Sequence, residues 1–269
     1  MREIVIFGCP FDRTSSYRRG SRFGPGAIRR ALQEIEDYSP FLKKELRDVK
    51  FSDRGDLNLL RNNTEEALER IASETRKIVR MGNIPCALGG EHLISLPVVQ
   101  AMKEKYKNLR VLYIDAHCDL KDTYSGLKFS HATVARRLLE LVGTESFFLF
   151  GARSGEREEF EFGEKKGILY NFSVNDFFQA SRIIKDSPVY LSLDLDIFDP
   201  GIFPGTGVPE PGGIGFYDFI QFIKRLLLNI KIAGMDIVEL SPPCDSTEAS
   251  SFLAATVVRE LILTAGSRI

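Results

Sequence analysis

Short, almost continuously apolar runs recur along the chain, and segments of helical period separate them. Apolar runs of this kind are typical of strands that are covered on both faces, as in parallel sheets. The runs lie at 3–8, 84–90, 110–115, 146–151, 167–170, 189–196 and 232–240, and candidate helices lie at 25–36, 64–81, 95–107, 131–142, 174–186, 216–229 and 247–265. This alternation predicts an α/β fold with a mainly parallel, doubly wound sheet and helices on both faces.

The organisation of the chain points to one domain. Its 269 residues fit one large domain or two small ones, and 43% of them are hydrophobic, which is ample for a core. No linker-like stretch, low-complexity segment or internal repeat divides the sequence. We therefore expect a single three-layer domain over residues 1–269. Within it, Thr64 is the candidate N-cap of the second helix, and Gly82 follows the end of that helix.

The composition of the chain indicates which binding partners and which cellular compartment are expected. Lys plus Arg number 36 and Asp plus Glu 37, so net charge gives no support for nucleic-acid binding. No uninterrupted apolar stretch approaches the length of a membrane span, and the N-terminus lacks the features of a signal peptide. The cysteines have no C-x-x-C spacing, which favours a reducing cytoplasm over a disulfide scaffold; they are Cys9, Cys86, Cys118 and Cys244.

Acidic residues and histidines follow four of the predicted strands directly. In open parallel sheets, ligands bind beyond the carboxyl ends of the strands. In extended backbone, residues i, i+2 and i+4 share a face, so each group could point into one cavity. The groups are Glu91 with His92 in "ALGGEH", Asp115, His117 and Asp119 in "YIDAHCDL", Asp194 and Asp196 in "LSLDLDIFDP", and Glu239 in "MDIVEL".

Together these groups predict a metal site. A single D-x-D after a strand is more often a capping or turn device, and a lone histidine after Gly-Gly is more often structural. Four aspartates and two histidines at one sheet edge are different, because burying such carboxylates without a cation is costly. Oxygen and nitrogen ligation without thiolate suits Mn²⁺ better than structural Zn²⁺. Six candidate ligands are too many for one ion, so two metals sharing carboxylates are expected.

Several motifs resemble those of the ureohydrolases, the family of arginase, agmatinase and related guanidino hydrolases. "GGEH", "DAHCD" and "SLDLDIFDP" resemble its metal-binding motifs, and "GMDIVELSPP" resembles the segment with its substrate-binding glutamate. "GTGVPEPGG" and the N-terminal "GCPFDRTSSYRRGSRFGPGAIRRA" resemble two further signatures, so the similarity runs nearly end to end. The resemblance implies an arginase-like fold, and subunits that associate as trimers or hexamers.

The resemblance also implies roles for individual residues. One Mn²⁺ would bind His92, Asp115, Asp119 and Asp194, and the other would bind His117, Asp115, Asp194 and Asp196. A hydroxide formed at the two metals would attack a guanidinium carbon and release urea. Glu239 would pair with the guanidinium, and His131 in "FSHAT" would transfer a proton without binding metal. Glu91, where many relatives have Asp, would lie behind the ligands.

The motifs do not choose the substrate, because all candidates share a guanidinium end. The tail is expected to contact "LKDTYSGLKFSHAT" (120–133), which has no Asn and is closer to the agmatinase than to the arginase pattern. This favours hydrolysis of agmatine to putrescine and urea, with arginine and 4-guanidinobutanoate as rivals. An amine tail needs an acceptor or an acid, and Asp122 and Glu210 are the candidate acids.

Two readings from other classes are weaker. A binuclear phosphatase would need a G-N-H-[DE] element and further histidines, and this chain has only three histidines in all. A non-catalytic guanidine- or polyamine-binding relative would have lost ligands, whereas every expected ligand is present.

Overall fold

The computed structural model describes residues 2–59 and 62–266. Its centre is an eight-stranded sheet in the order β4-β1-β5-β10-β9-β6-β7-β8. Every neighbouring pair of these strands is parallel, which confirms the predicted sheet. The strands are β1 (Ile4–Cys9), β4 (Phe51–Asp56), β5 (Ile84–Gly89), β6 (Arg110–Ile114), β7 (Phe147–Phe150), β8 (Leu169–Tyr170), β9 (Pro188–Asp194) and β10 (Lys231–Val238).

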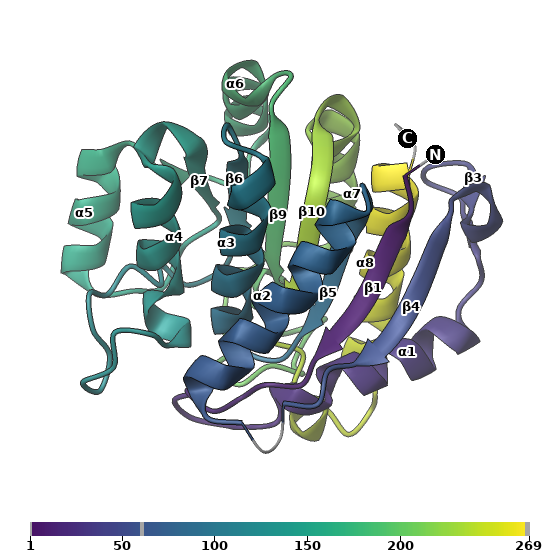
Figure 1. Ribbon diagram of the computed structural model, residues 1–269, viewed down its shortest axis with the longest axis horizontal. Coiled ribbons are helices and arrows are strands. Elements are labelled where there is room, and N and C mark those ends of the chain that lie inside the picture. The colour runs from purple at the N-terminus through teal and green to yellow at the C-terminus, as the bar shows by residue number, and fades with distance from the viewer. Residues whose placement is uncertain (1, 60–61, 267–269) are drawn as a thin grey trace.

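Helices cover both faces of this sheet, so the fold has the three layers expected (Figure 1). On one face, Ile28 and Phe222 pack in a core shared by α1, α6, α7 and α8; on the other, Ile71 and Leu138 pack in a core shared by α2, α3 and α4. The helices are α1 (Gly24–Glu34), α2 (Thr64–Arg80), α3 (Ser95–Lys105), α4 (Val134–Val142), α5 (Arg157–Lys166), α6 (Val174–Ile184), α7 (Phe216–Arg225) and α8 (Ala249–Gly266).

The strand order determines where chemistry can occur. Strands β9 and β10 are last in sequence, yet they lie between β5 and β6 in the sheet. The four strands β5, β10, β9 and β6 are therefore consecutive neighbours, and they run in the same direction. Their carboxyl ends meet at one edge, and these are the four strand ends that carry the predicted site residues.

One edge strand, one helix and one short hairpin were not expected from the sequence. Strand β4 lies at the edge of the sheet, and its sequence "FSDRGD" has no apolar run because it pairs only with β1. Helix α5 buries only Glu159 and Gly163, so its apolar signal is weak. Its start depends on a capping box between Glu156 and Glu159. The short hairpin consists of β2 (Tyr38–Ser39) and β3 (Lys44–Glu45).

Several boundaries also differ from the expected ones. Asn63, not Thr64, caps α2, because its side chain accepts the backbone N–H of Glu66. The helix expected from residue 131 begins with a 3-10 turn, His131–Thr133, before α4. Strand β9 ends at Asp194, and Asp196 lies in a following 3-10 turn rather than in extended chain.

Helix α8 has the length and composition of a membrane span, but 72% of it is buried inside the fold. Its two charged residues, Arg259 and Glu260, both have polar partners within the fold. Arg259 Nη2 lies 2.7 Å from Glu260 Oε1, and Ser39 Oγ donates to Glu260 Oε2 at 2.7 Å. The helix is therefore a core element of the third layer.

Candidate metal centre and active site

The six predicted metal ligands lie together at the carboxyl edge of the four central strands. They come from the segments that follow β5 and β6 and from the end of β9. A cavity of about 320 Å³ opens over this edge. Its wall includes His92, His117, Asp119, Asp194 and Asp196, and also the predicted catalytic residues His131 and Glu239.

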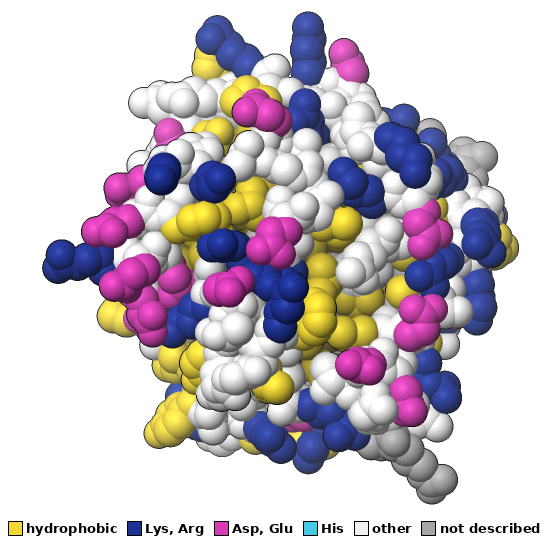
Figure 2. Space-filling model, turned by 60° about the vertical axis from the view of Figure 1, so that its left-hand side comes forward, with side chains coloured by type: hydrophobic (Ala, Val, Ile, Leu, Met, Phe, Trp, Pro, Cys, Tyr) yellow, Lys and Arg dark blue, Asp and Glu magenta, His cyan; other side chains and the backbone are white. Residues whose placement is uncertain are grey.

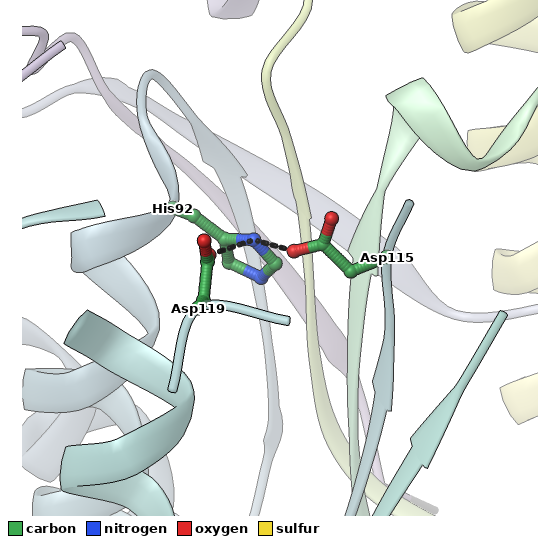
Figure 3. A group of neighbouring side chains, drawn as sticks. All are labelled: His92, Asp115 and Asp119. Atoms are coloured by element: carbon green, nitrogen blue, oxygen red, sulfur yellow. Dashed lines mark ion pairs between the residues drawn. The ribbon is translucent and has the colours of Figure 1, made fainter. Parts of the chain in front are cut away.

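One cluster of potential ligands surrounds His92. Its Nδ1 lies 3.0 Å from Asp115 Oδ2, 3.1 Å from Asp194 Oδ2 and 3.8 Å from Asp119 Oδ2. Figure 3 shows the His92 ring between the carboxylates of Asp115 and Asp119. Potential ligand atoms of His92, Asp115 and Asp119 lie within 4.8 Å of one another, a spacing that can hold one ion.

A second cluster surrounds His117. Its Nδ1 lies 2.8 Å from Asp196 Oδ2 and 3.5 Å from Asp115 Oδ1. Asp115 thus belongs to both clusters, with one oxygen turned to each histidine. Asp194 contacts His92 through Oδ2, while its Oδ1 accepts the backbone N–H of Asp196 at 2.8 Å. The two groups of potential ligands therefore adjoin each other and share Asp115.

The chemistry of these groups fits divalent cations. Asp115 Oδ2 is buried and has no hydrogen-bond partner among the described residues. Among the described residues, the four aspartates of the two clusters form ion pairs only with His92 and His117. Burial and the Asp115 charge raise the pKa of Asp119, and burial with the Asp196 and Asp115 charges raises the pKa of Asp194. Bound cations would remove this mutual repulsion.

Residues behind the potential ligands orient the His92 ring, and they were not expected from the sequence. His92 Nε2 lies 2.8 Å from Ser192 Oγ, which in turn donates to Asp236 Oδ1 at 2.8 Å. Tyr113 stacks on the imidazole with 4.3 Å between ring centroids. With Nε2 engaged in this way, Nδ1 is the nitrogen that faces the carboxylates. The sequence feature that points to such a residue is a polar side chain inside an otherwise apolar strand, as Ser192 is in "VYLSLD".

Asp115, His117 and Asp119 follow β6 but do not continue it as an extended strand, contrary to the sequence-based expectation. Strand β6 ends at Ile114, and Asp119 has a left-handed φ of 51°. The three side chains converge because the chain turns at this point, not because they alternate along a strand. The predicted alternation of these residues along an extended strand is wrong, because β6 ends at Ile114.

Glu239 follows β10 on the wall of the same cavity. Its Oε1 accepts the backbone N–H of His92 at 2.9 Å, which places the carboxylate beside the first cluster. Its backbone has a φ of 64°, a left-handed conformation that is uncommon for a residue with a side chain. Enclosure by protein and the charge of Glu91 raise the pKa of Glu239. A cationic group in the cavity would relieve both effects.

His131 also lines the cavity and lies outside both clusters of potential ligands. Its Nδ1 is 3.7 Å from Glu91 Oε2, and burial lowers the pKa of the ring to about 4. Its backbone N–H donates to Thr14 Oγ1 at 3.1 Å, and Thr14 N–H donates to Glu91 Oε1 at 2.6 Å. Burial raises the pKa of Glu91 to about 7. Thr14, which the sequence reading did not single out, thus links His131 to Glu91.

The structure separates the two acids considered for the substrate tail. Asp122 is not part of the cavity wall, and its Oδ1 pairs with Arg137 Nη2 at 2.7 Å. Glu210 does line the cavity. Its Oε1 accepts a hydrogen bond from Ser154 Oγ at 2.9 Å and lies 3.6 Å from His117 Nε2.

Comparison with known proteins gives consistent matches over nearly the whole chain. The family model "Arginase family" matches residues 2–264. An agmatinase of Bacillus anthracis is 40% identical over 264 residues, covering 97% of this chain and 91% of the relative. A guanidinobutyrase of Pseudomonas aeruginosa is 33% identical over 278 residues, covering 97% and 85%. The crystal structure of the agmatine ureohydrolase of Thermoplasma volcanium superposes with a TM-score of 0.87 at 35% identity, covering 98% of this chain and 90% of that one.

Proposed function

The chain belongs to the arginase family, and on that premise we propose that it is a binuclear manganese hydrolase that converts agmatine to putrescine and urea. The observation that carries this proposal is the position of Asp115. Its two oxygens are divided between the His92 and His117 clusters, so one carboxylate can join two cations. A shared carboxylate between two ions is the arrangement used in two-metal hydrolysis.

We assign six side chains as ligands of the two ions. Asp115 and Asp194 are assigned as bridges. Asp115 has one oxygen near His92 and the other near His117. Asp194 contacts His92 through Oδ2, and its Oδ1 accepts the backbone N–H of Asp196 in the second cluster. Carboxylate and imidazole ligands without thiolate favour Mn²⁺. When bound, the two ions lower the pKa of a bound water towards neutrality. The assigned sets are His92, Asp115, Asp119 and Asp194, and His117, Asp115, Asp194 and Asp196.

The protein's own groups then position the guanidinium. Glu239 presents a carboxylate to the cavity beside His92, where it can accept the planar N–H groups of a guanidinium. His131 faces the same space with a ring that is neutral at pH 7, because burial lowers its pKa to about 4. A neutral imidazole can accept a proton from the attacking water. These roles assign guanidinium binding to Glu239 and proton transfer to His131.

Glu239→Gln should weaken substrate binding and turnover without emptying the metal site. The amide keeps an oxygen for the His92 N–H but loses the counter-charge to the guanidinium. Loss of a charged hydrogen bond should lower kcat/KM by about 10- to 100-fold. The checks are steady-state kinetics and metal analysis of the purified variant. Loss of manganese from this variant would place Glu239 in the metal site instead.

The substrate assignment draws on the relatives at 40% identity that are named agmatinase. We expect kcat/KM for agmatine to exceed that for arginine and for 4-guanidinobutanoate by at least about tenfold, or about 1.4 kcal/mol of transition-state discrimination. Urea release from the three compounds at equal Mn²⁺ measures this. A tenfold preference for arginine would reject agmatine as substrate and leave the family unchanged.

The same assay separates the function from the readings in other classes. A phosphatase would release phosphate from esters and no urea, and a binding relative would release no urea with or without Mn²⁺. The presence of all six predicted ligand residues in two clusters favours catalysis over binding alone.

Compartment, assembly and domain count also belong to the proposal. All four cysteines are free, which supports a cytoplasmic location. On the face seen in Figure 2, Lys and Arg side chains are interspersed with Asp and Glu, which supports a small-molecule partner rather than nucleic acid. Exposed Phe178 and Tyr217 on the neighbouring helices α6 and α7 supply apolar surface for a homo-oligomer. One shared sheet supports a single domain over 1–269.

A further inference from the structure

The outer wall of the cavity, beyond the metal ligands, carries several charged side chains. The acids are Glu156, Glu159 and Glu210, and the bases are Arg18 and Lys121. A substrate whose guanidinium lies beside Glu239 must place its other end among these groups. Which of them is available to that end can be decided from their existing partners.

Most of these charges are already engaged. Glu159 is buried and accepts the backbone N–H groups of Leu120 at 2.8 Å and of Glu156 at 2.9 Å. Glu156 Oε1 lies 2.5 Å from Lys121 Nζ, so these two charges offset each other. Arg18 Nε donates to the carbonyl of Gly207 at the exposed rim.

Glu210 is different, because its carboxylate has no Lys or Arg partner among the described residues. Its side chain is 27% exposed, and Oε1 accepts a hydrogen bond from Ser154. The guanidinium of Arg153 instead donates to the backbone carbonyls of Asp196 and Glu210 at 2.9 Å, and to that of Pro211 at 3.0 Å. Arg153 therefore holds the segment that bears Glu210 in place without pairing with its carboxylate.

Glu210 also lies on the outer side of a metal-site residue. His117 Nδ1 faces Asp115 and Asp196, and the opposite ring nitrogen, Nε2, is 3.6 Å from Glu210 Oε1. The carboxylate is thus separated from the cation positions by the width of one imidazole. Glu210 and His117 both line the cavity, so Glu210 belongs to the wall next to the proposed metal site.

We propose that Glu210 is the residue that selects the tail of the substrate, by accepting the ammonium group of a primary amine. This inference rests on the proposed guanidine hydrolysis and deepens it. A carboxylate on the cavity wall attracts an ammonium and repels the carboxylate of arginine or 4-guanidinobutanoate. Because Arg153 and Ser154 fix its position, little ordering is needed when the tail binds.

The test compares agmatine with N-butylguanidine, which has the same guanidinium and four-carbon chain but no amine. In the manganese-loaded enzyme, Glu210→Gln should lower kcat/KM for agmatine by about 10- to 100-fold, the usual effect of losing a charged hydrogen bond. The value for N-butylguanidine should change by less than about threefold, since that substrate has no group for Glu210 to bind. Asp122→Asn is the matched control, an acid just outside the cavity, and should alter neither value by more than about threefold.

An equal fall for the two substrates, or a loss of manganese from Glu210→Gln, would overturn the proposal, because Glu210 would then act on His117 and the metal site. Unchanged kinetics with agmatine would overturn it as well.

Binding of putrescine to the manganese-loaded protein, measured by calorimetry, separates this proposal from the proposed function. Glu210→Gln should weaken that binding by about 10- to 100-fold whichever guanidine is hydrolysed fastest. If the wild-type enzyme prefers arginine but putrescine binding still depends on Glu210, the substrate assignment fails and the ammonium site stands. Equal putrescine affinity in the wild-type and Glu210→Gln proteins would refute the ammonium site and leave the proposed function unaffected.

Discussion

An Asp115→Ala variant is expected to purify with fewer than about one Mn²⁺ per chain and to lose at least about 10³-fold in kcat/KM, because metal-ion catalysis supplies several kcal/mol. The reason is geometric. Among the described residues, Asp115 is the carboxylate that has one oxygen 3.0 Å from His92 Nδ1 and the other 3.5 Å from His117 Nδ1. Its removal weakens both cation positions together. Metal analysis after dialysis, followed by urea release at saturating Mn²⁺, measures the two losses.

His92→Ala is the matched control, since it removes a ligand assigned to only one ion. This variant should keep about one ion per chain and more activity than Asp115→Ala, because the His117 cluster retains its own ligands. Circular dichroism of both variants checks that the fold is intact. Two bound ions with near-normal turnover in Asp115→Ala would contradict the shared-carboxylate assignment.

The central strands were predictable because their sequences report burial on both faces. In β1, Ile4 and Ile6 pack in one core while Val5 and Phe7 pack in the other, so every position is apolar. Edge strand β4 gives no such signal, because it has one strand neighbour and a largely exposed, polar sequence. It is held partly by ion pairs of Arg29 with Asp53 and Asp56, which link residues far apart in the chain.

Helix α5 was missed for a related reason. Its sequence "REEFEFGEKK" contains Gly163, which lowers helix propensity. At that position a Cβ atom would lie 2.8 Å from the side chain of Leu169, so the glycine permits close packing of the helix on β8. A requirement that arises from tertiary packing cannot be read from local sequence.

The proposed ligand residues could be picked out from the sequence because parallel topology brings strand ends together, and acidic and histidine side chains are conspicuous at those ends. The shell around them could not. Ser192 and Thr14 contact the site across 100 and 77 residues of sequence respectively, through His92 and Glu91. Such contacts depend on the order of strands in the sheet, in which β9 and β10 insert between β5 and β6. That insertion is a property of the whole fold, and no local pattern encodes it.

His131 tests whether proton transfer and metal binding reside in different residues. It lies in a 3-10 turn before α4, outside both ligand clusters. Its Nδ1 is buried without a hydrogen-bond partner among the described residues. The imidazole ring packs edge to face against Tyr124, with 5.3 Å between the ring centroids. Burial lowers the pKa of His131 to about 4, so the ring is neutral above that pH and can accept a proton at pH 7.

His131→Asn should therefore keep two Mn²⁺ per chain but slow the reaction by roughly 10²- to 10⁴-fold, the usual contribution of a general acid or base. The backbone N–H to Thr14 Oγ1 does not involve the ring, so the variant should retain the local fold. His117→Asn makes the same substitution in the same cavity and should instead lose metal, because His117 Nδ1 faces Asp196 at 2.8 Å. Manganese content and kcat are measured for both variants. If His131→Asn also loses manganese, the histidine is a ligand, and the separation of proton transfer from metal binding fails.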